Sequence, residues 1–362
     1  MPERICRWGI LGAANIARKN WQGIRKSGNS TISAVASRDP AKAQAFINEC
    51  QAAVPFPQAP APCTYEELLR RDDVDAVYIP LPTGIRTEWV LRAANSGKHV
   101  LCEKPCGTNA AEVKAMIAAC AKNGVQFMDG VMFMHGQRLQ LMRAVLDDGS
   151  TIGDVRRIAT QFCFAGTGDF YSSNIRVSPQ LEPLGCLGDL GWYNVRFCLW
   201  VMGYRMPEKV HGRMIASHSG TVPTEFSGEL LFADGVSASF YCSFRTENQQ
   251  WAHVSGTKGS LMVRDFVVPF FGNESTFETN APTLRVEGCD FHMRDRARNH
   301  SIFEYSDGES DAQETNMIRN FADLVVAKKL DPMWGEIALK TQRVLDACMN
   351  SAKAGGALQP VF

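Results

Sequence analysis

The chain has 362 residues, enough for about two domains of ordinary size. Its 38 lysines and arginines balance its 38 aspartates and glutamates. Without a basic or acidic block, the chain offers no electrostatic attraction to nucleic acid or to an anionic membrane surface, so we expect neither as a partner. Hydrophobic residues make up 45% of the chain, which suffices for packed cores, but no apolar run reaches the roughly 18 residues of a membrane span.

Cysteine usage and the first residues bear on the compartment. The 12 cysteines are scattered and form no C-x-x-C pair. Since free cysteine packs as a small hydrophobic residue, we expect reduced thiols, a cytoplasmic protein and no metal site. A structural metal is the alternative. Residues 1–6 lead directly into a strand and lack the features of a secretory signal.

Strand and helix patterns alternate over residues 1–130, which predicts a parallel α/β sheet. Asp39 is the expected N-cap of the second helix, and Thr64 to Glu67 is a candidate capping box. The predicted strands are 7–11, 31–36, 76–79, 99–102 and 125–128, and the predicted helices are 14–26, 40–50, 87–96 and 109–122.

The pattern changes after about residue 150, where one strand follows another from Val155 to about Tyr305. Asp234-Gly235 between two apolar strands predicts a hairpin. Few crossover helices interrupt this region, so its sheet should be open and mostly antiparallel. The predicted helices are 187–202, 311–329 and 334–354. We therefore predict an α/β domain over 1–130 and an α+β domain over 131–362, with the helices of 311–354 as candidates for the domain junction.

Gly12 begins the sequence G-x-A-x-x-A between the first strand and the first helix. This is a weakened form of the dinucleotide fingerprint G-x-G-x-x-G/A. Gly12 suits the tight turn, and the backbone N–H groups around Ala14, Asn15 and Ile16 would face a pyrophosphate. Ala14 replaces the glycine that permits the closest approach. The alternative is a turn with only a structural role.

The second strand ends in Ser37-Arg38, where an acidic residue would bind a ribose 2′-hydroxyl. Arg38 can instead pair with a 2′-phosphate in a bidentate manner, and Ser37 can donate a hydrogen bond. We therefore predict NADP(H) in preference to NAD(H). A solvated surface arginine is the alternative.

Glu103-Lys104-Pro105 follows the predicted strand 99–102. Parallel sheets bind ligands in the crevice at the carboxyl ends of their strands, and Pro105 prevents the chain from simply entering a helix there. Lys104 should thus be held at the crevice. An ordinary loop pair of Glu and Lys is the alternative.

These motifs, with Leu81-Pro82-Thr83 and in this order, resemble the glucose–fructose oxidoreductase/inositol dehydrogenase family over essentially the whole chain. The resemblance implies a Rossmann domain that binds the dinucleotide and a second domain that binds substrate and forms a homo-oligomer, a dimer or tetramer. It implies an oxidoreductase that transfers hydride between the nicotinamide and a carbinol or carbonyl carbon of a small molecule: a sugar, polyol or trans-dihydrodiol. It also adds Pro82, Thr83, Glu103 and Lys104 to the cofactor contacts.

The family also carries G-x-x-x-D-x-x-x-H/Y on a helix of the substrate domain, which gives Asp189 and Tyr193 here. Four residues apart, the two should share one helix face. The resemblance implies that Lys104 orients and polarises the substrate oxygen. Tyr193 is then the acid/base, with its pKa of ~10 lowered by the ammonium. Asp189 would bind substrate hydroxyls or orient the lysine. Packing roles for Asp189 and Tyr193 are the alternatives.

Other positions are weaker candidates or depart from the family pattern. Arg86 stands where members often have histidine, and we expect either a bound substrate anion or a surface role. His135 could line the pocket, although a hydrogen-bonded role between domains is favoured. Arg176 and Trp192 are further candidates for substrate contact. Two other functions stay open: a dinucleotide-sensing regulator without catalysis, and a sugar–sugar oxidoreductase that retains NADP.

Overall fold

The computed structural model describes residues 5–362. The expectation that residues 1–6 lack a secretory signal concerns in part residues 1–4, which lie outside the described range. The chain forms two compact units, each built from three segments. The first unit ends its main segment at His135 and also includes Ser178–Pro183 and Asp307–Gln342. The other residues form the second unit. A single boundary near residue 130, as predicted, thus does not describe the two units. The chain returns to the first unit twice, at residues 178–183 and 307–342.

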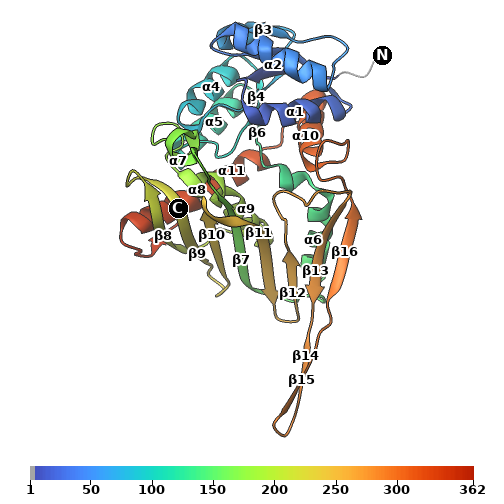
Figure 1. The fold of residues 1–362 in the computed structure, drawn as a ribbon, viewed down its shortest axis with the longest axis vertical. Coiled ribbons are helices and arrows are strands. Elements are labelled where there is room, and N and C mark those ends of the chain that lie inside the picture. The colour runs from blue at the N-terminus through green and yellow to red at the C-terminus, as the bar shows by residue number, and fades with distance from the viewer. Residues whose placement is uncertain (1–4) are drawn as a thin grey trace. The chain divides into compact units, whose positions relative to one another are not determined.

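The first unit contains six parallel strands in the order β3-β2-β1-β4-β5-β6 (Figure 1). This confirms the predicted parallel sheet. The order reverses between β1 and β4, and ligands bind at such a reversal in doubly wound sheets. The elements of this part are β1 (Cys6–Leu11), α1 (Asn15–Lys26), β2 (Ser30–Ala36), α2 (Pro40–Ala53), β3 (Ala61–Cys63), α3 (Tyr65–Arg70), β4 (Ala76–Ile79), α4 (Thr83–Asn95), β5 (His99–Cys102), α5 (Ala110–Lys122), β6 (Phe127–Asp129) and the 3₁₀ turn η1 (Met132–His135).

Two predicted helix starts are confirmed. The Asp39 carboxylate accepts from the backbone N–H of Ala41 at 2.9 Å and caps α2. Thr64 and Glu67 form the reciprocal capping box of α3. Each satisfies backbone donors that a helix start leaves without intrahelical partners.

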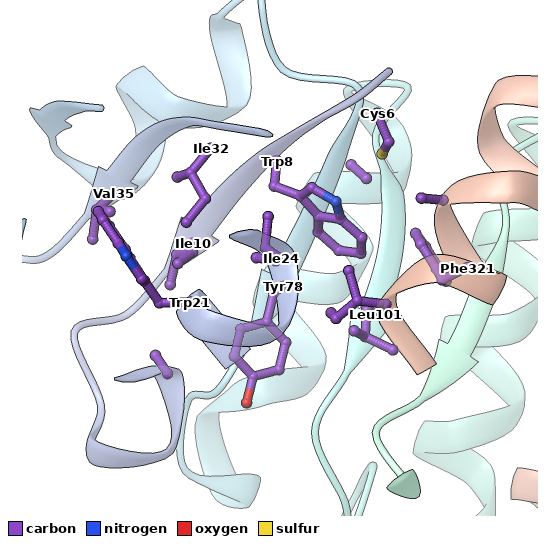
Figure 2. Packing of buried hydrophobic residues seen from close by; sticks show 14 of the residues in the cluster. Cys6, Trp8, Ile10, Trp21, Ile24, Ile32, Val35, Tyr78, Leu101 and Phe321 are labelled. Atoms are coloured by element: carbon purple, nitrogen blue, oxygen red, sulfur yellow. The ribbon is translucent and has the colours of Figure 1, made fainter. Parts of the chain in front are cut away.

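A helix from near the end of the chain completes the core of the first unit. α10 (Gln313–Ala327) contributes Phe321, whose ring centroid lies 5.1 Å from that of Trp8 in β1. Figure 2 shows both side chains in one cluster with Trp21 and Tyr78. The sequence places this helix in the second domain, as a candidate for the domain junction. In the structure its apolar face is buried against β1 and α1, where each large side chain contributes about 1.5–3 kcal/mol.

The second unit contains nine strands in the order β16-β13-β12-β11-β7-β10-β9-β8-β17, antiparallel except for the pair β7–β10. This confirms the predicted, mostly antiparallel sheet. Leu231 pairs with Ser237 across the predicted Asp234-Gly235 turn. Its elements are α6 (Gln137–Asp147), β7 (Val155–Ala165), α7 (Phe170–Ser173), η2 (Ile175–Val177), α8 (Gly185–Asp189), α9 (Gly191–Val201), β8 (Lys209–His218), β9 (Val222–Leu231), β10 (Ser237–Ser243), β11 (Arg245–Gly256), β12 (Ser260–Val263), β13 (Glu274–Asn280), β14 (Thr283–Glu287), β15 (Asp290–Arg294), β16 (Arg298–Phe303) and β17 (Gln359–Pro360), while α11 (Met333–Lys353) spans residues of both units.

The prediction of one helix over 187–202 is wrong at Leu190. α8 ends at Asp189 and α9 begins at Gly191, so Asp189 and Tyr193 lie on separate helices. Leu190 between them keeps right-handed helical angles, and its carbonyl accepts from the N–H of Tyr193 at 3.2 Å. Gly191 is closely packed at this position. A Cβ on Gly191 would lie 3.0 Å from the Leu187 side chain and 3.4 Å from the Cys242 sulfur of β10. Glycine therefore permits close packing at the start of α9, where a Cβ would press on the Leu187 side chain.

Candidate active site

The turn between β1 and α1 fits an anion. Gly12 has φ +127°, and its N–H donates to the carbonyl of Ala36 at 3.0 Å. Ala14 begins α1 without a side-chain cap, and the first turn carries no acidic residue. Asn15 and Ile16 are exposed. The partial positive charge of the helix start is thus not neutralised by the helix's own side chains, as binding of a pyrophosphate there requires.

The end of β2 offers one positive charge. Arg38 is exposed and Ser37 is buried. The acidic neighbour, Asp39, already caps α2. Burial raises the pKa of the Tyr65 hydroxyl, and the nearby Arg38 guanidinium partly offsets this rise. The group at this strand end that is suited to a phosphate is therefore Arg38.

Lys104 lies in a turn that is fixed by buried hydrogen bonds. Directly after β5, Glu103 is only 8% exposed and accepts a 2.6 Å hydrogen bond from the Tyr78 hydroxyl. The other Glu103 oxygen accepts from the backbone N–H of Lys104 at 3.1 Å. Burial, and then the charge of Glu103, hold the pKa of Tyr78 well above its ordinary value. The Lys104–Pro105 peptide is cis, and Lys104 itself is half-buried.

Arg86 is neither on the surface nor in a position to bind a substrate anion, which corrects both expectations for it. Its side chain is 3% exposed. Nε donates to the carbonyl of Leu81 at 2.8 Å, and Nη1 donates to the carbonyls of Glu103 (2.9 Å) and Pro105. Arg86 thus ties the loop after β4 to the turn that carries Lys104. Sequence reasoning missed this role because a pattern cannot show which carbonyls a buried arginine will meet.

Glu182 was also missed. Its carboxylate accepts from the Thr83 backbone N–H at 3.0 Å and from the Thr83 hydroxyl at 2.6 Å, at the start of α4. The next residue, Gly84, donates to the carbonyl of Leu181 at 2.8 Å, and a Cβ there would lie 2.0 Å from the carbonyl oxygen of Gln180. Thr83 is 1% exposed, and its hydroxyl proton already goes to Glu182, whereas Pro82 is half-buried. The glycine at position 84 was the only feature of the sequence to indicate that another segment packs closely against the start of α4.

In the second unit, Arg176 and Asp189 form an ion pair. Arg176 Nε donates to Asp189 Oδ2 at 2.8 Å, with side-chain exposures of 45% and 15%. Tyr193 is 7% exposed, and its ring meets the Phe162 ring edge-on at 5.7 Å. Trp192 is fully buried, which leaves no surface for a substrate, so we do not retain it as a substrate contact.

His135 packs within the first unit. Its Nδ1 lies 3.0 Å from the Asn320 amide nitrogen, and its ring stacks on Trp334 at 4.6 Å. It is 6% exposed. The favoured expectation was a hydrogen-bonded role between domains; the contacts described for His135 are with Asn320 and Trp334 of its own unit.

Three further observations concern residues 5–362. Over this range no group of three or more His, Cys, Asp or Glu side chains is arranged to hold a metal ion. None of the helices described combines the length and apolar character needed to cross a bilayer. All 12 cysteines fall within the range; no disulfide joins any of them, and 11 are buried while Cys289 is exposed.

Two family models match the chain: the NAD-binding Rossmann fold of the GFO/IDH/MocA oxidoreductases over residues 6–131, and the C-terminal domain of the same family over residues 139–262. The protein belongs to this family, which defines an NAD(P)-dependent oxidoreductase acting on CH–OH groups and confirms the resemblance drawn from the motifs.

The chain is similar to characterised relatives along most of its length. It is 30% identical to a D-xylose 1-dehydrogenase (NADP(+)) of Haloferax volcanii over 97% of this chain and 99% of that protein. It is 34% identical to a mouse trans-1,2-dihydrobenzene-1,2-diol dehydrogenase over 73% of this chain and 76% of that protein. In fold it is similar to a 3-ketoreductase of Actinomadura kijaniata solved with NADP and TDP-benzene, at a TM-score of 0.81 and 24% identity over 96% of this chain and 98% of that one.

Proposed function

We propose that the protein transfers hydride between NADP(H) and a carbinol or carbonyl carbon of a sugar, polyol or trans-dihydrodiol, in the cytoplasm. The observation that carries this proposal is the turn after β5, where a half-buried lysine follows a central parallel strand and its backbone is held by Glu103 and Arg86. A family relative acts on D-xylose and another on a trans-dihydrodiol.

The dinucleotide would be held by Gly12 and the start of α1, at Ala14, Asn15 and Ile16, and by Pro82 and the turn at Glu103. Arg38, with Ser37, would bind the 2′-phosphate that distinguishes NADP from NAD. Asp39 supports this preference because its carboxylate is used as a helix cap. Thr83 contributes by positioning, since its hydroxyl is bonded to Glu182.

The bound nicotinamide supplies a hydride donor or acceptor; the chain must move one proton and stabilise charge on the substrate oxygen. Lys104 would orient that oxygen by donating a hydrogen bond from its ammonium group. Tyr193 would give or take the hydroxyl proton. Asp189, held by Arg176, would accept hydrogen bonds from neighbouring substrate hydroxyls.

The test begins with parallel fluorescence titrations of the purified protein with NADPH and NADH. We expect tighter binding of NADPH, and loss of that preference by about 10- to 100-fold in Arg38→Ala, the worth of one or two charge-assisted hydrogen bonds. Arg25→Ala is the matched control, because it removes another exposed arginine, which belongs to α1 and donates to the carbonyl of Pro55. An unchanged NADPH/NADH ratio in Arg38→Ala would refute the 2′-phosphate contact.

D-xylose and trans-1,2-dihydrobenzene-1,2-diol are the first substrates to assay, by the change in nicotinamide absorbance. Turnover of either supports the proposal. Tight cofactor binding with no turnover over a wide panel of sugars, polyols and dihydrodiols would favour the regulator. NADP that survives purification, with exchange between two sugars, would favour the enzyme that retains its cofactor.

A further inference from the structure

A two-stranded arm extends from the second unit. β14 and β15 are joined by Gly288-Cys289 and form a sheet of their own. All residues of both strands are exposed. Figure 1 shows the arm continuing beyond β13 and β16, which precede and follow it in the chain.

One face of the arm is apolar. Leu284 pairs with Met293, and Val286 pairs with Phe291. Because side chains alternate along a strand, these four share a face. Their exposed fractions are 54%, 67%, 52% and 72% in that order. The other face carries the polar pair Arg285 and His292.

A two-stranded arm with an exposed apolar face is expected to pack against another surface. An isolated two-stranded hairpin is marginal in water, and a contiguous exposed apolar surface commonly marks an interaction site. The base of the arm is nevertheless fixed to the sheet. The Asn280 side chain donates to Asp295 at 2.7 Å and accepts from the backbone N–H of Arg296 at 3.3 Å. The arm is therefore held in an extended direction with its apolar face uncovered.

A second apolar surface lies in the same unit, which we call the aromatic patch: Phe270, Phe271, Phe303 and Tyr305. Their exposed fractions are 63%, 97%, 59% and 38%. The two segments that carry them are joined where the Ser306 backbone N–H donates to the carbonyl of Gly272 at 3.0 Å. The rings of Phe303 and Tyr305 lie 5.4 Å apart.

The arm and the aromatic patch lie at opposite ends of one ladder. β13 pairs with β16 from Glu274–Phe303, at the patch, to Thr279–Arg298, at the base of the arm. The arm points away from its own patch and cannot cover it. β16 is also the outermost strand of its sheet, and no strand within residues 5–362 pairs with its outer edge. Proteins usually cover such an edge.

We propose that the occupant of the aromatic patch is the arm of a second copy of this chain. Two copies related by a two-fold axis beside β16 would run their edge strands in opposite directions. Each arm would then reach the patch of the other, so that both apolar surfaces are covered by one self-complementary contact. This interaction surface is separate from the proposed chemistry and does not depend on it.

The exposed thiol at the tip of the arm makes a direct test possible. Phe271→Cys places a second exposed thiol in the patch, and a short bismaleimide joins it to Cys289 of the other copy. We expect a covalent dimer of the full chain in Phe271→Cys and its loss when Cys289→Ser is added. Lys122→Cys, an exposed position of the first unit, is the control and should give no such dimer.

Variants of the two faces of the arm complete the test. Adding Leu284→Lys and Phe291→Lys to Phe271→Cys should abolish the cross-linked dimer, whereas Arg285→Ser with His292→Ser should preserve it. All these side chains are exposed, so unchanged thermal unfolding verifies folding. Equal cross-linking of Phe271→Cys and Lys122→Cys, or a dimer insensitive to the lysines, would overturn the proposal. A dimeric mass in solution without this cross-link would also overturn it, because another surface would then form the dimer.

Discussion

The two units hold their proposed catalytic residues by different means. In the first, the turn that carries Lys104 is fixed by hydrogen bonds from Arg86 and Tyr78, whose side chains are buried. In the second, Asp189 ends a helix at a break and pairs with a largely exposed arginine. A buried network with every group bonded has one arrangement, whereas an exposed ion pair is weak and competes with water. We therefore expect the turn that carries Lys104 to be rigid and the Asp189–Arg176 pair to adapt its position to a substrate.

The largest effects should come from the reacting groups. We expect Tyr193→Phe to lower kcat by about 10²- to 10⁴-fold, the usual contribution of a positioned proton-transfer group. The substitution removes only a hydroxyl and retains the ring contact with Phe162, so the free energy of unfolding should fall by no more than about 1.5 kcal/mol, the net contribution of one hydrogen bond. Lys104→Met should lower kcat to a similar degree. Steady-state kinetics with NADP+ and a carbinol substrate from the panel, followed by the formation of NADPH, measure both effects.

NADPH titration separates chemistry from binding in these variants. Both should retain the fold, and Tyr193→Phe should retain wild-type affinity for the dinucleotide. If kcat of Tyr193→Phe equals that of the wild type, the tyrosine has only its packing role.

Removal of Arg86 should loosen the turn that carries Lys104. Arg86→Ala leaves the carbonyls of Leu81, Glu103 and Pro105 without the buried donor that they share. We expect a loss of about 3 kcal/mol in the free energy of unfolding, since each unsatisfied buried group costs roughly 1–3 kcal/mol and partial hydration relieves some of this. Urea denaturation measures it, and kcat should fall as Lys104 loses its fixed position.

Arg92→Ala is the matched control on the same helix. Arg92 is exposed, pairs with Glu66 and Glu88, and lies over the Trp89 ring. Its loss should cost no more than about 1 kcal/mol. Equal costs for the two variants would mean that the Arg86 contacts are not a buried clamp.

The sequence predicted the first unit well because its information is local. Asp39 caps α2, Thr64 and Glu67 form their box, and β4 and β5 have the predicted bounds. Each depends on residues a few positions apart. The family motifs likewise identified the fold class and the class of reaction.

The features of the first unit that the sequence did not predict are contacts between segments far apart in the chain. The carboxylate of Glu182 meets Thr83 across 99 positions of chain, and α10 enters the core of the first unit from near the chain's end. The helix break at Leu190 was missed for another reason. Spacing alone suggested one helix, while Gly191 packs closely against Leu187 and against Cys242 of β10, which lies 51 positions further along the chain.

A buried carboxyl in the second unit predicts a pH effect. Glu304 is 2% exposed and accepts from the Gln137 N–H at 2.7 Å. Burial raises its pKa above 4.5, partly offset by that hydrogen bond. As pH rises, the unfolded chain therefore loses this proton first, and the free energy of unfolding falls between pH 4.5 and the folded pKa. We expect Glu304→Gln to remove this fall, measured by urea denaturation across that window. Glu247→Gln, at an exposed position, should leave it unchanged, and an identical slope in Glu304→Gln would contradict the argument.

The smallest effect on stability should come from breaking the ion pair between Arg176 and Asp189. Because Arg176 is 45% exposed, Arg176→Ala should cost less than about 1 kcal/mol. Its effect should appear in substrate binding: Asp189 loses the partner that orients it, so KM should rise while kcat and NADPH affinity stay close to wild type. Added salt should raise KM of the wild type in the same direction, because it screens the exposed pair, and should have less effect on the variant. A fall in kcat with unchanged KM would mean that Asp189 acts on the reaction step rather than on substrate binding. The proposed difference between Asp189 and the Lys104 turn would then be wrong.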